Sequence, residues 1–136
     1  MAKMNQRMRE IFENQQVVVL ATASKNGIPN VVPIVAKKII DNETILISDQ
    51  FFNKTLANMK DNPQVALTCW DKDEGYQIKG KAAIETSGQL YQDTARWIEE
   101  LGKQLNKPIK SKGAVVVKIT EIYDVSPGPQ AGVKIA

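Results

Sequence analysis

The sequence predicts a mainly β domain of the α+β class, in which six antiparallel strands form a small closed or nearly closed barrel with helices packed outside it. Three observations favour this class. Six segments rich in apolar and β-branched residues are bounded by turn signals, consecutive segments follow one another as a meander, and few segments show helical periodicity. At 136 residues the chain can bury one core and shows no internal repeat, so we expect a single domain over residues 1–136.

The first half of the chain predicts a helix and then three strands. Residues 2–14 place apolar side chains three or four positions apart, which is the spacing of an amphipathic helix. Asn26-Gly27 favours a tight turn between the first two strands, because both residues tolerate positive φ. Proline cannot donate to a strand ladder, so Pro33 must lie at an edge, in a bulge, or where something other than a strand faces the backbone. The three strands are predicted at residues 17–23, 30–40 and 44–48.

The second half predicts two helices and three further strands. A short helix is expected at residues 54–61, and Pro63 ends it before the next strand. Gly80 inside a strand pattern predicts a bulge or bend, such as small barrels use to close. Ser87 is a candidate cap for a longer helix. The strands are predicted at 64–71, 76–86 and 113–127, the longer helix at 88–106, and a Pro/Gly-rich tail follows.

Composition argues against several functional classes. The net charge of +3 arises from 18 basic and 15 acidic residues spread along the whole chain, so we expect no nucleic-acid surface. The densest basic cluster is read as a solvated helix end and loop. No apolar run approaches the roughly 20 residues that span a bilayer, and the first residues lack the pattern of a secretory signal. We therefore expect a cytoplasmic protein without membrane contact. The basic cluster comprises Lys103, Lys107, Lys110 and Lys112.

The chain contains no histidine and a single cysteine, Cys69. The absence of histidine excludes Ser-His-Asp and Cys-His catalysis and histidine-ligated metal sites. A single thiol cannot form an intramolecular disulfide or a structural zinc site. Cys69 lies in an apolar strand pattern, which favours a buried structural residue over a reactive thiol. We predict no metal site and assign no catalytic side chain, so if the protein is an enzyme, a bound cofactor is expected to perform the chemistry.

The start of the predicted helix 54–61 is a candidate phosphate site. A helix N-terminus leaves N–H groups without intrahelical partners, and its dipole makes that end partly positive. Asn53 is a candidate cap, Lys54 adds a full positive charge, and the Thr55 hydroxyl can donate a hydrogen bond. The alternative interpretation is an ordinary capped surface helix.

The ordered series of segments resembles the FMN-binding split-barrel family, whose members include pyridoxamine 5′-phosphate oxidase and small FMN-binding proteins. The resemblance runs from VVVLATASKNGIPNVVPIV through ETILISDQFFNKTLANMKDNPQVALTCW to YQIKGKAAI. It rests on a strand that ends in Ser-Asp, a short loop, a basic residue, and a helix that closes with Asn-Pro. The resemblance implies a six-stranded antiparallel split β-barrel with flanking helices that binds FMN.

The same resemblance implies roles for particular residues. Backbone at Pro33, Ile34 and Val35 would line one side of the isoalloxazine ring, and Ser48 and Asp49 would lie beside the flavin or its ribityl chain. The phosphate would be held by the helix entrance, with Asn53 as its cap and Lys54 and Thr55 as direct contacts. Lys38 matches a basic position of the oxidase pattern only roughly and is equally well read as an exposed strand lysine.

The family resemblance also implies a homodimer with a flavin at the subunit interface and a redox role as an FMN-dependent oxidoreductase. Trp70, Trp97, Tyr123 and the tail after Pro127 are candidates for completing the partner's pocket, with plain core packing as the alternative for the aromatic residues. Without histidine, oxidation of pyridoxamine phosphate is doubtful, and the small FMN-binding proteins are the better comparison. Two alternatives remain open: a deazaflavin-dependent reductase on the same barrel, and a non-catalytic barrel that binds nucleic acid.

Overall fold

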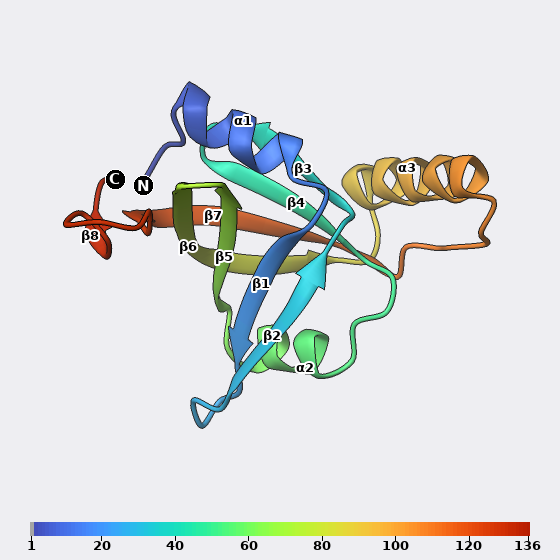
Figure 1. Cartoon of the computed structure of the whole chain (residues 1–136). Helices are drawn as coiled ribbons and strands as arrows, with labels where there is room; N and C mark the ends of the chain where they lie inside the picture. Colours follow the sequence, from blue (N-terminus) through green and yellow to red (C-terminus); the bar gives the residue numbers. More distant parts are fainter. Residues whose placement is uncertain (1) are drawn as a thin grey trace.

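The computed structural model describes residues 2–136 as an antiparallel split barrel with three helices (Figure 1). The eight-stranded sheet has the order β2-β1-β5-β6-β7-β4-β3, and β8 pairs with β7. The strands are β1 (Val18–Ala23), β2 (Pro29–Ile34), β3 (Lys37–Asp41), β4 (Thr44–Asp49), β5 (Gln64–Asp71), β6 (Glu74–Glu85), β7 (Gly113–Asp124) and β8 (Val133–Lys134). The helices are α1 (Gln6–Asn14), α2 (Lys54–Asp61) and α3 (Gln89–Leu105).

The two end strands of the sheet, β2 and β3, are consecutive in the chain. Only Val35 and Ala36 separate them, and β2 pairs with β1 whereas β3 pairs with β4. The sheet must therefore curl until its two edges approach, although β2 and β3 do not pair with each other. This opening is the split of the barrel.

The strand count corrects the sequence prediction of six strands. The segment predicted as one strand at 30–40 divides into β2 and β3, because the chain leaves β1 after Ile34 and joins β4 from Lys37 onward. Pro33 lies in the edge strand β2 opposite Val19, which is one of the three arrangements expected for it. The tail adds β8, which pairs with its own chain at Tyr123 and Asp124.

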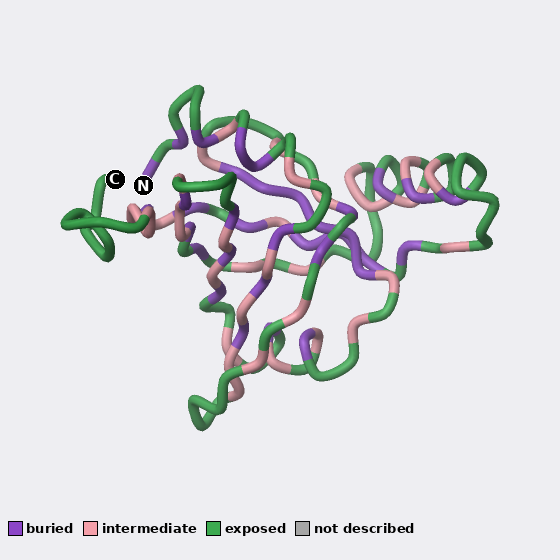
Figure 2. Tube along the Cα trace, viewed as in Figure 1, coloured by how far each residue is buried: buried purple, intermediate pink, exposed green. Residues whose placement is uncertain are grey.

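A buried apolar core fills the barrel, and α1 lies across one end of it (Figures 1 and 2). The helix begins later than the predicted residue 2, because the Asn5 side chain accepts a hydrogen bond from the Met8 N–H at 2.9 Å and caps it there. Before the cap, the Met4 N–H donates to the Asn42 carbonyl. The helix contributes Met8, Ile11 and Phe12 to the core.

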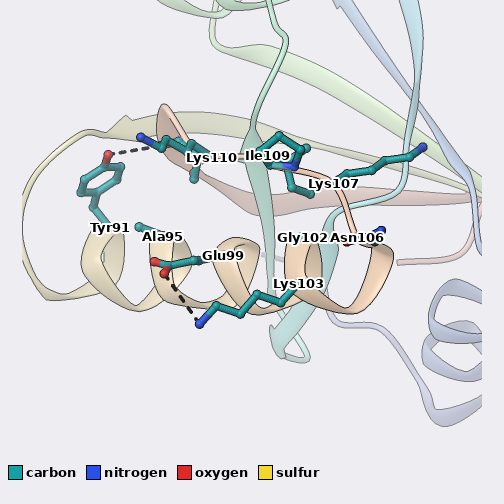
Figure 3. A pocket seen from close by; sticks show the side chains of 11 residues that line it. Tyr91, Ala95, Glu99, Gly102, Lys103, Asn106, Lys107, Ile109 and Lys110 are labelled. Atoms are coloured by element: carbon teal, nitrogen blue, oxygen red, sulfur yellow. Dashed lines mark hydrogen bonds and ion pairs between the residues drawn. The ribbon is translucent and has the colours of Figure 1, made fainter.

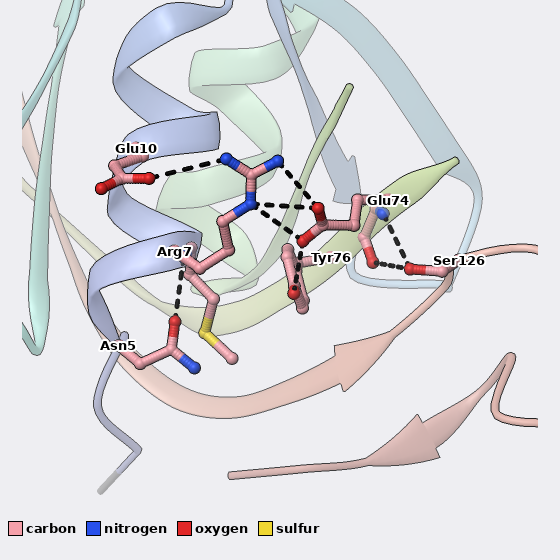
Figure 4. Close-up of polar contacts among 8 residues, drawn as sticks. Asn5, Arg7, Glu10, Glu74, Tyr76 and Ser126 are labelled. Carbon is pink, nitrogen blue, oxygen red and sulfur yellow. Dashed lines mark hydrogen bonds and ion pairs between the residues drawn. The ribbon is translucent and has the colours of Figure 1, made fainter. Parts of the chain in front are cut away.

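A polar cluster fixes α1 to the start of β6 (Figure 4). The Arg7 guanidinium donates to both carboxylate oxygens of Glu74, with its shortest contact at 2.8 Å. The Tyr76 hydroxyl donates to the same carboxylate at 3.1 Å. The hydrogen bonds from Arg7 lower the pKa of Glu74, and burial first, then the bond to Glu74, raises the pKa of Tyr76.

Helix α3 lies outside the barrel and packs mainly against β7 (Figure 1). Ser87 does not cap it; Gly88, at φ 90°, occupies the cap position and no side chain bonds the first turn. Only Thr94, Ile98 and Gly102 are buried along the helix, while Trp97 and Leu101 are half-exposed. Among residues 2–136 there is no helix whose length and hydropathy would let it cross a membrane.

Gly80 confirms the predicted bulge and yields a stability prediction. The β6–β7 register shifts between Lys79 and Gly80, and a Cβ built at Gly80 would lie 2.5 Å from the Lys118 carbonyl oxygen. We expect Gly80→Ala to lower the free energy of unfolding by about 1–3 kcal/mol, because the two strands must move apart. Urea unfolding measures the change. Gly113→Ala in β7 is the matched control, since its Cβ would meet no atom closer than 3.6 Å; equal losses in both variants would contradict the prediction.

The Arg7–Glu74 contact predicts a pH dependence. A carboxyl whose folded-state pKa is lowered stabilises the fold above its unfolded-state pKa, and this contribution is lost as the pH falls through the folded-state value. We expect Arg7→Met to raise the Glu74 pKa in a carboxyl NMR titration. It should also destabilise the protein more at pH 7 than below the folded-state pKa. Arg96→Met, which removes only a 3.8 Å surface contact to Asp93, should leave the Glu74 titration unchanged.

Candidate functional site

A cleft of about 420 Å³ opens at the split of the barrel, between β2, the end of β4 and the start of α2. Of the eight residues that the sequence assigned to cofactor binding, seven line this cleft, and only Asp49 does not. Sequence reasoning missed Asn30 and Gln50, because neither belongs to a recognisable motif. The lining residues are Asn30, Val32, Pro33, Ile34, Val35, Ala36, Ser48, Gln50, Phe51, Phe52, Asn53, Lys54 and Thr55.

One end of the cleft is the N-terminus of α2. The first helical hydrogen bond runs from the Ala57 N–H to the Asn53 carbonyl, so the N–H groups of residues 54–56 have no partner within the helix. Asn53 does not cap the helix as expected, because its side chain makes no hydrogen bond to the first turn. Within residues 2–136 no carboxylate lies within ion-pair distance of the exposed Lys54. This end therefore offers several donors and a positive charge to an anion.

Gln50 places an acceptor in the same cleft. Its Oε1 atom is buried and has no hydrogen-bond partner, and no other buried side-chain nitrogen or oxygen between residues 2 and 136 is in this state. A buried acceptor without a partner costs roughly 1–3 kcal/mol, so such an atom favours a ligand that brings an N–H or O–H group. The cleft thus combines donors at one end with an acceptor elsewhere in its wall.

Asp49 lies behind the cleft and organises its rim. The side chain is 1% exposed, and its Oδ1 atom accepts a hydrogen bond from the Phe52 N–H at 2.9 Å. The Lys112 backbone N–H donates to the Asp49 carbonyl at 2.6 Å, and the Lys112 Nζ lies 3.9 Å from Oδ1. These contacts order the loop that carries Gln50 and Phe51. A direct contact between Asp49 and a ligand stays a prediction.

Ser48, by contrast, lines the cleft from the end of β4. Its hydroxyl donates to the Ser111 hydroxyl at 2.7 Å, and Ser111 donates to the Gly113 carbonyl at 3.1 Å. The hydrogen of the Ser48 hydroxyl is therefore used within the protein, and Ser48 can offer a ligand only acceptor capacity.

The apolar part of the cleft is open to solvent. Phe51 is 81% exposed and Val35 is 52% exposed, and the neighbouring Val31 of β2 is 64% exposed. Large apolar side chains gathered beside a cleft mark a surface that binds a ligand or another protein.

A second cavity, of about 750 Å³, lies between α3 and the segment that follows it (Figure 3). Three lysines of the predicted basic cluster line it, namely Lys103, Lys107 and Lys110. The cavity runs along α3, but its lysines lie at the C-terminal end of the helix and in the segment that follows, where the helix dipole is negative, and Lys103 already contacts Glu99 and Glu100. Although larger, this cavity is therefore a weaker anion site than the α2 entrance.

The other candidate residues lie outside the cleft. Lys38 is exposed, and its Nζ lies 4.2 Å from the centroid of the Trp97 ring. The Tyr123 hydroxyl donates to Glu121 at 2.7 Å, and Trp70 is partly exposed. Cys69 is fully buried, as expected, and burial raises the pKa of its thiol to about 11, so the thiol is protonated near neutral pH.

Sequence comparison places the chain in a family. Residues 4–126 match the family of pyridoxamine 5′-phosphate oxidase, and the chain belongs to this family. Over 98% of its length it is 47% identical to an uncharacterized protein of Methanocaldococcus jannaschii, MJ0282, of which the match covers 89%.

Solved structures with the same fold have diverse ligands. HupZ of Group A Streptococcus has a TM-score of 0.78 at 24% identity, with 95% of this chain and 99% of that chain covered. An FMN-binding protein of Syntrophomonas wolfei has a TM-score of 0.72 at 23% identity, with 87% and 83% covered. HutZ, the heme storage protein of Vibrio cholerae, has a TM-score of 0.65 at 14% identity, with 90% and 95% covered. At these identities the likeness shows the fold alone, so the ligand must be argued from the cleft.

Proposed function

We propose that the protein binds FMN in the cleft at the split of the barrel and serves a redox function as an FMN-dependent oxidoreductase. The observation that carries this proposal is the polarity of the cleft: unpartnered N–H groups and Lys54 at one end, and the orphaned Gln50 Oε1 in its wall. FMN has a matching distribution, with a phosphate at one end, hydroxyl and N–H donors along its length, and a flat apolar ring. Membership of the family and the fold shared with an FMN-binding protein support the assignment.

In this proposal each part of the cleft has a separate task. Lys54, Thr55 and the free N–H groups of α2 hold the phosphate, while Asn53 forms the turn before them. Pro33, Ile34 and Val35 lie against one side of the ring, and Ser48 accepts a hydrogen bond from the ribityl chain. Asp49 keeps the loop of Gln50 and Phe51 in place.

Bound FMN would supply hydride or electron transfer, and the protein would control access and orientation. The chain has no histidine, and none of the carboxylates among residues 2–136 lines the cleft. The wall therefore offers mainly positive charge from Lys54 and the α2 dipole, which favours anionic forms of a ligand. We assign no side chain as a general acid or base.

We further propose that a second copy of the chain covers the open side of the cleft in a homodimer. The exposed apolar side chains of Val35 and Phe51 in the cleft, and of Val31 in the adjoining strand β2, support such a cover, because a monomer would leave them and the ligand ring in water. The tail does not supply the cover within one chain, since β8 pairs with β7.

A deazaflavin cofactor is the second candidate, and the cavity beside α3 favours it. A deazaflavin carries a longer acidic tail, for which Lys107 and Lys110 offer positive charge. An F420 reductase shares the fold, with a TM-score of 0.65 at 19% identity and 88% of this chain and 98% of that chain covered. Acid release of the bound cofactor followed by mass determination and an absorbance spectrum separates the two candidates.

The phosphate assignment predicts the effect of a single substitution. We expect Lys54→Ala to weaken FMN binding at least about tenfold, because a charge-assisted hydrogen bond contributes about 1.5–3 kcal/mol. Fluorescence quenching of FMN during titration measures the affinity. Lys60→Ala is the matched control, because Lys60 is exposed in the last turn of the same helix and lies outside the cleft. If Lys54→Ala and the wild-type protein bind FMN with equal affinity, the phosphate does not bind at the N-terminus of α2.

The dimer proposal predicts a change of mass in solution. We expect Val31→Glu to convert a dimer into a monomer and to weaken FMN binding, because the new charge would be buried at the interface. Sedimentation equilibrium measures the mass. Ile40→Glu in β3 is the control, since Ile40 is similarly exposed but belongs to the opposite sheet edge. A wild-type protein that stays monomeric when saturated with FMN would refute the dimer.

A further inference from the structure

A partly buried network of amides and hydroxyls joins α2 to the first two strands. The Asn30 Nδ2 atom donates to the Thr22 hydroxyl oxygen at 3.1 Å and to the Thr55 hydroxyl oxygen at 3.0 Å. The Asn58 Nδ2 atom donates to the same Thr22 oxygen at 3.1 Å. Thr22 and Asn30 are directly paired across β1 and β2, so the register of the two strands sets this geometry.

The direction of these hydrogen bonds constrains Thr55. An amide nitrogen has two hydrogens, and Asn30 uses one for each threonine. The Thr55 oxygen therefore serves as an acceptor toward Asn30, and its own hydrogen remains to be donated. Within the described part of the chain, that hydrogen makes no hydrogen bond to a protein acceptor.

The position of Thr55 determines which acceptor its hydroxyl hydrogen can reach. The residue is 3% exposed and lines the cleft next to Lys54, in the first turn of α2, where the N–H groups have no partner within the helix. A buried hydroxyl hydrogen needs an acceptor, and no hydrogen bond between the described residues supplies one. An anionic oxygen of the ligand meets this need.

We propose that Asn30 is a positioning residue that holds the Thr55 oxygen as an acceptor, so that the Thr55 hydroxyl donates to the ligand's phosphate. Asn30 thereby sets the preference of the cleft for a phosphorylated ligand over its unphosphorylated form. This inference rests on the proposed function, because it refines how the same cleft recognises FMN. Asn30 itself need not touch the ligand.

The test compares FMN with riboflavin, which lacks the phosphate. We expect wild-type protein to prefer FMN and Asn30→Asp to reduce the ratio of riboflavin to FMN dissociation constants about tenfold or more, because loss of a hydrogen bond to a charged group has roughly this effect. A carboxylate at position 30 has no N–H and accepts the Thr55 hydrogen instead. Riboflavin affinity should change less than FMN affinity, which a general loss of structure would not produce.

A double-mutant cycle separates positioning from direct charge repulsion. We expect Asn30→Asp to reduce the ratio much less in a Thr55→Val background, which keeps the side-chain shape without the hydroxyl. Direct repulsion between a carboxylate and the phosphate would persist in that background and would overturn the inference. Asn58→Asp adds the same charge to the network but contacts only Thr22, so it should retain most of the FMN preference.

The same binding measurements also define which results would overturn the inference. If Asn30→Asp fails to fold, Asn30→Leu takes its place in the same cycle as an uncharged variant of similar size, with an expected coupling of about threefold. A wild-type preference for FMN that survives either substitution would overturn this inference and leave the proposed function intact. Equal wild-type affinities for FMN and riboflavin, or binding of neither, would overturn the phosphate assignment and this inference with it.

Discussion

The two-residue crossing from β2 to β3 is the constraint on which the rest of the structure depends. The three Cα–Cα steps from Ile34 to Lys37 can span only about 11 Å, so the opposite ends of the sheet order must come close together. The Ala36 carbonyl still accepts a hydrogen bond from the Ser48 N–H of β4 at 3.1 Å, but β2 pairs only with β1 and β3 only with β4, so the two strands do not pair with each other across the crossing. A permanent gap in an otherwise continuous sheet results, and the cleft lies in that gap.

The position of α2 follows from the same gap. The chain leaves β4 at Asp49, whose buried carboxylate ties the next three residues into a loop, and the helix then begins beside the start of β2, where Thr55 meets Asn30. Because Thr22 and Asn30 bind Thr55 and Asn58, the helix is held by side chains of the two strands that form one wall of the gap. Donors and apolar surface are thus fixed in one rigid arrangement before a ligand arrives, which lowers the entropic cost of binding.

Local signals accounted for much of the fold. The helix at 54–61 was predictable from its flanking proline and spacing, and the bulge at Gly80 from a glycine in a strand pattern. The division of residues 30–40 was not predictable locally, because it depends on β3 finding β4 and on β2 finding β1. Ser87 failed as a cap because Gly88, with positive φ, makes the turn into α3.

The candidate site shows the same limit. Pro33, Lys54 and Thr55 were predictable because their residue types have distinctive chemistry at a strand edge or a helix start. Asn30 and Gln50 were not, because a surface amide has no distinctive sequence pattern. Their importance appears only when the fold brings Asn30 to Thr55 and buries the Gln50 oxygen.

Pro33 also limits how copies of the chain can associate, because it lies at a free edge of the sheet. Strand β2 is a free sheet edge, and Pro33 in it lies between the exposed side chains of Val31 and Val35 in the sequence. Such an edge is a template for adding strands from other chains, the process that leads to aggregates and fibrils. Proline in an edge strand removes a backbone donor from that edge. The residue that lines the cleft thus also interrupts the edge, so that copies of the chain can meet through side chains at β2 but cannot continue the sheet from one molecule to the next.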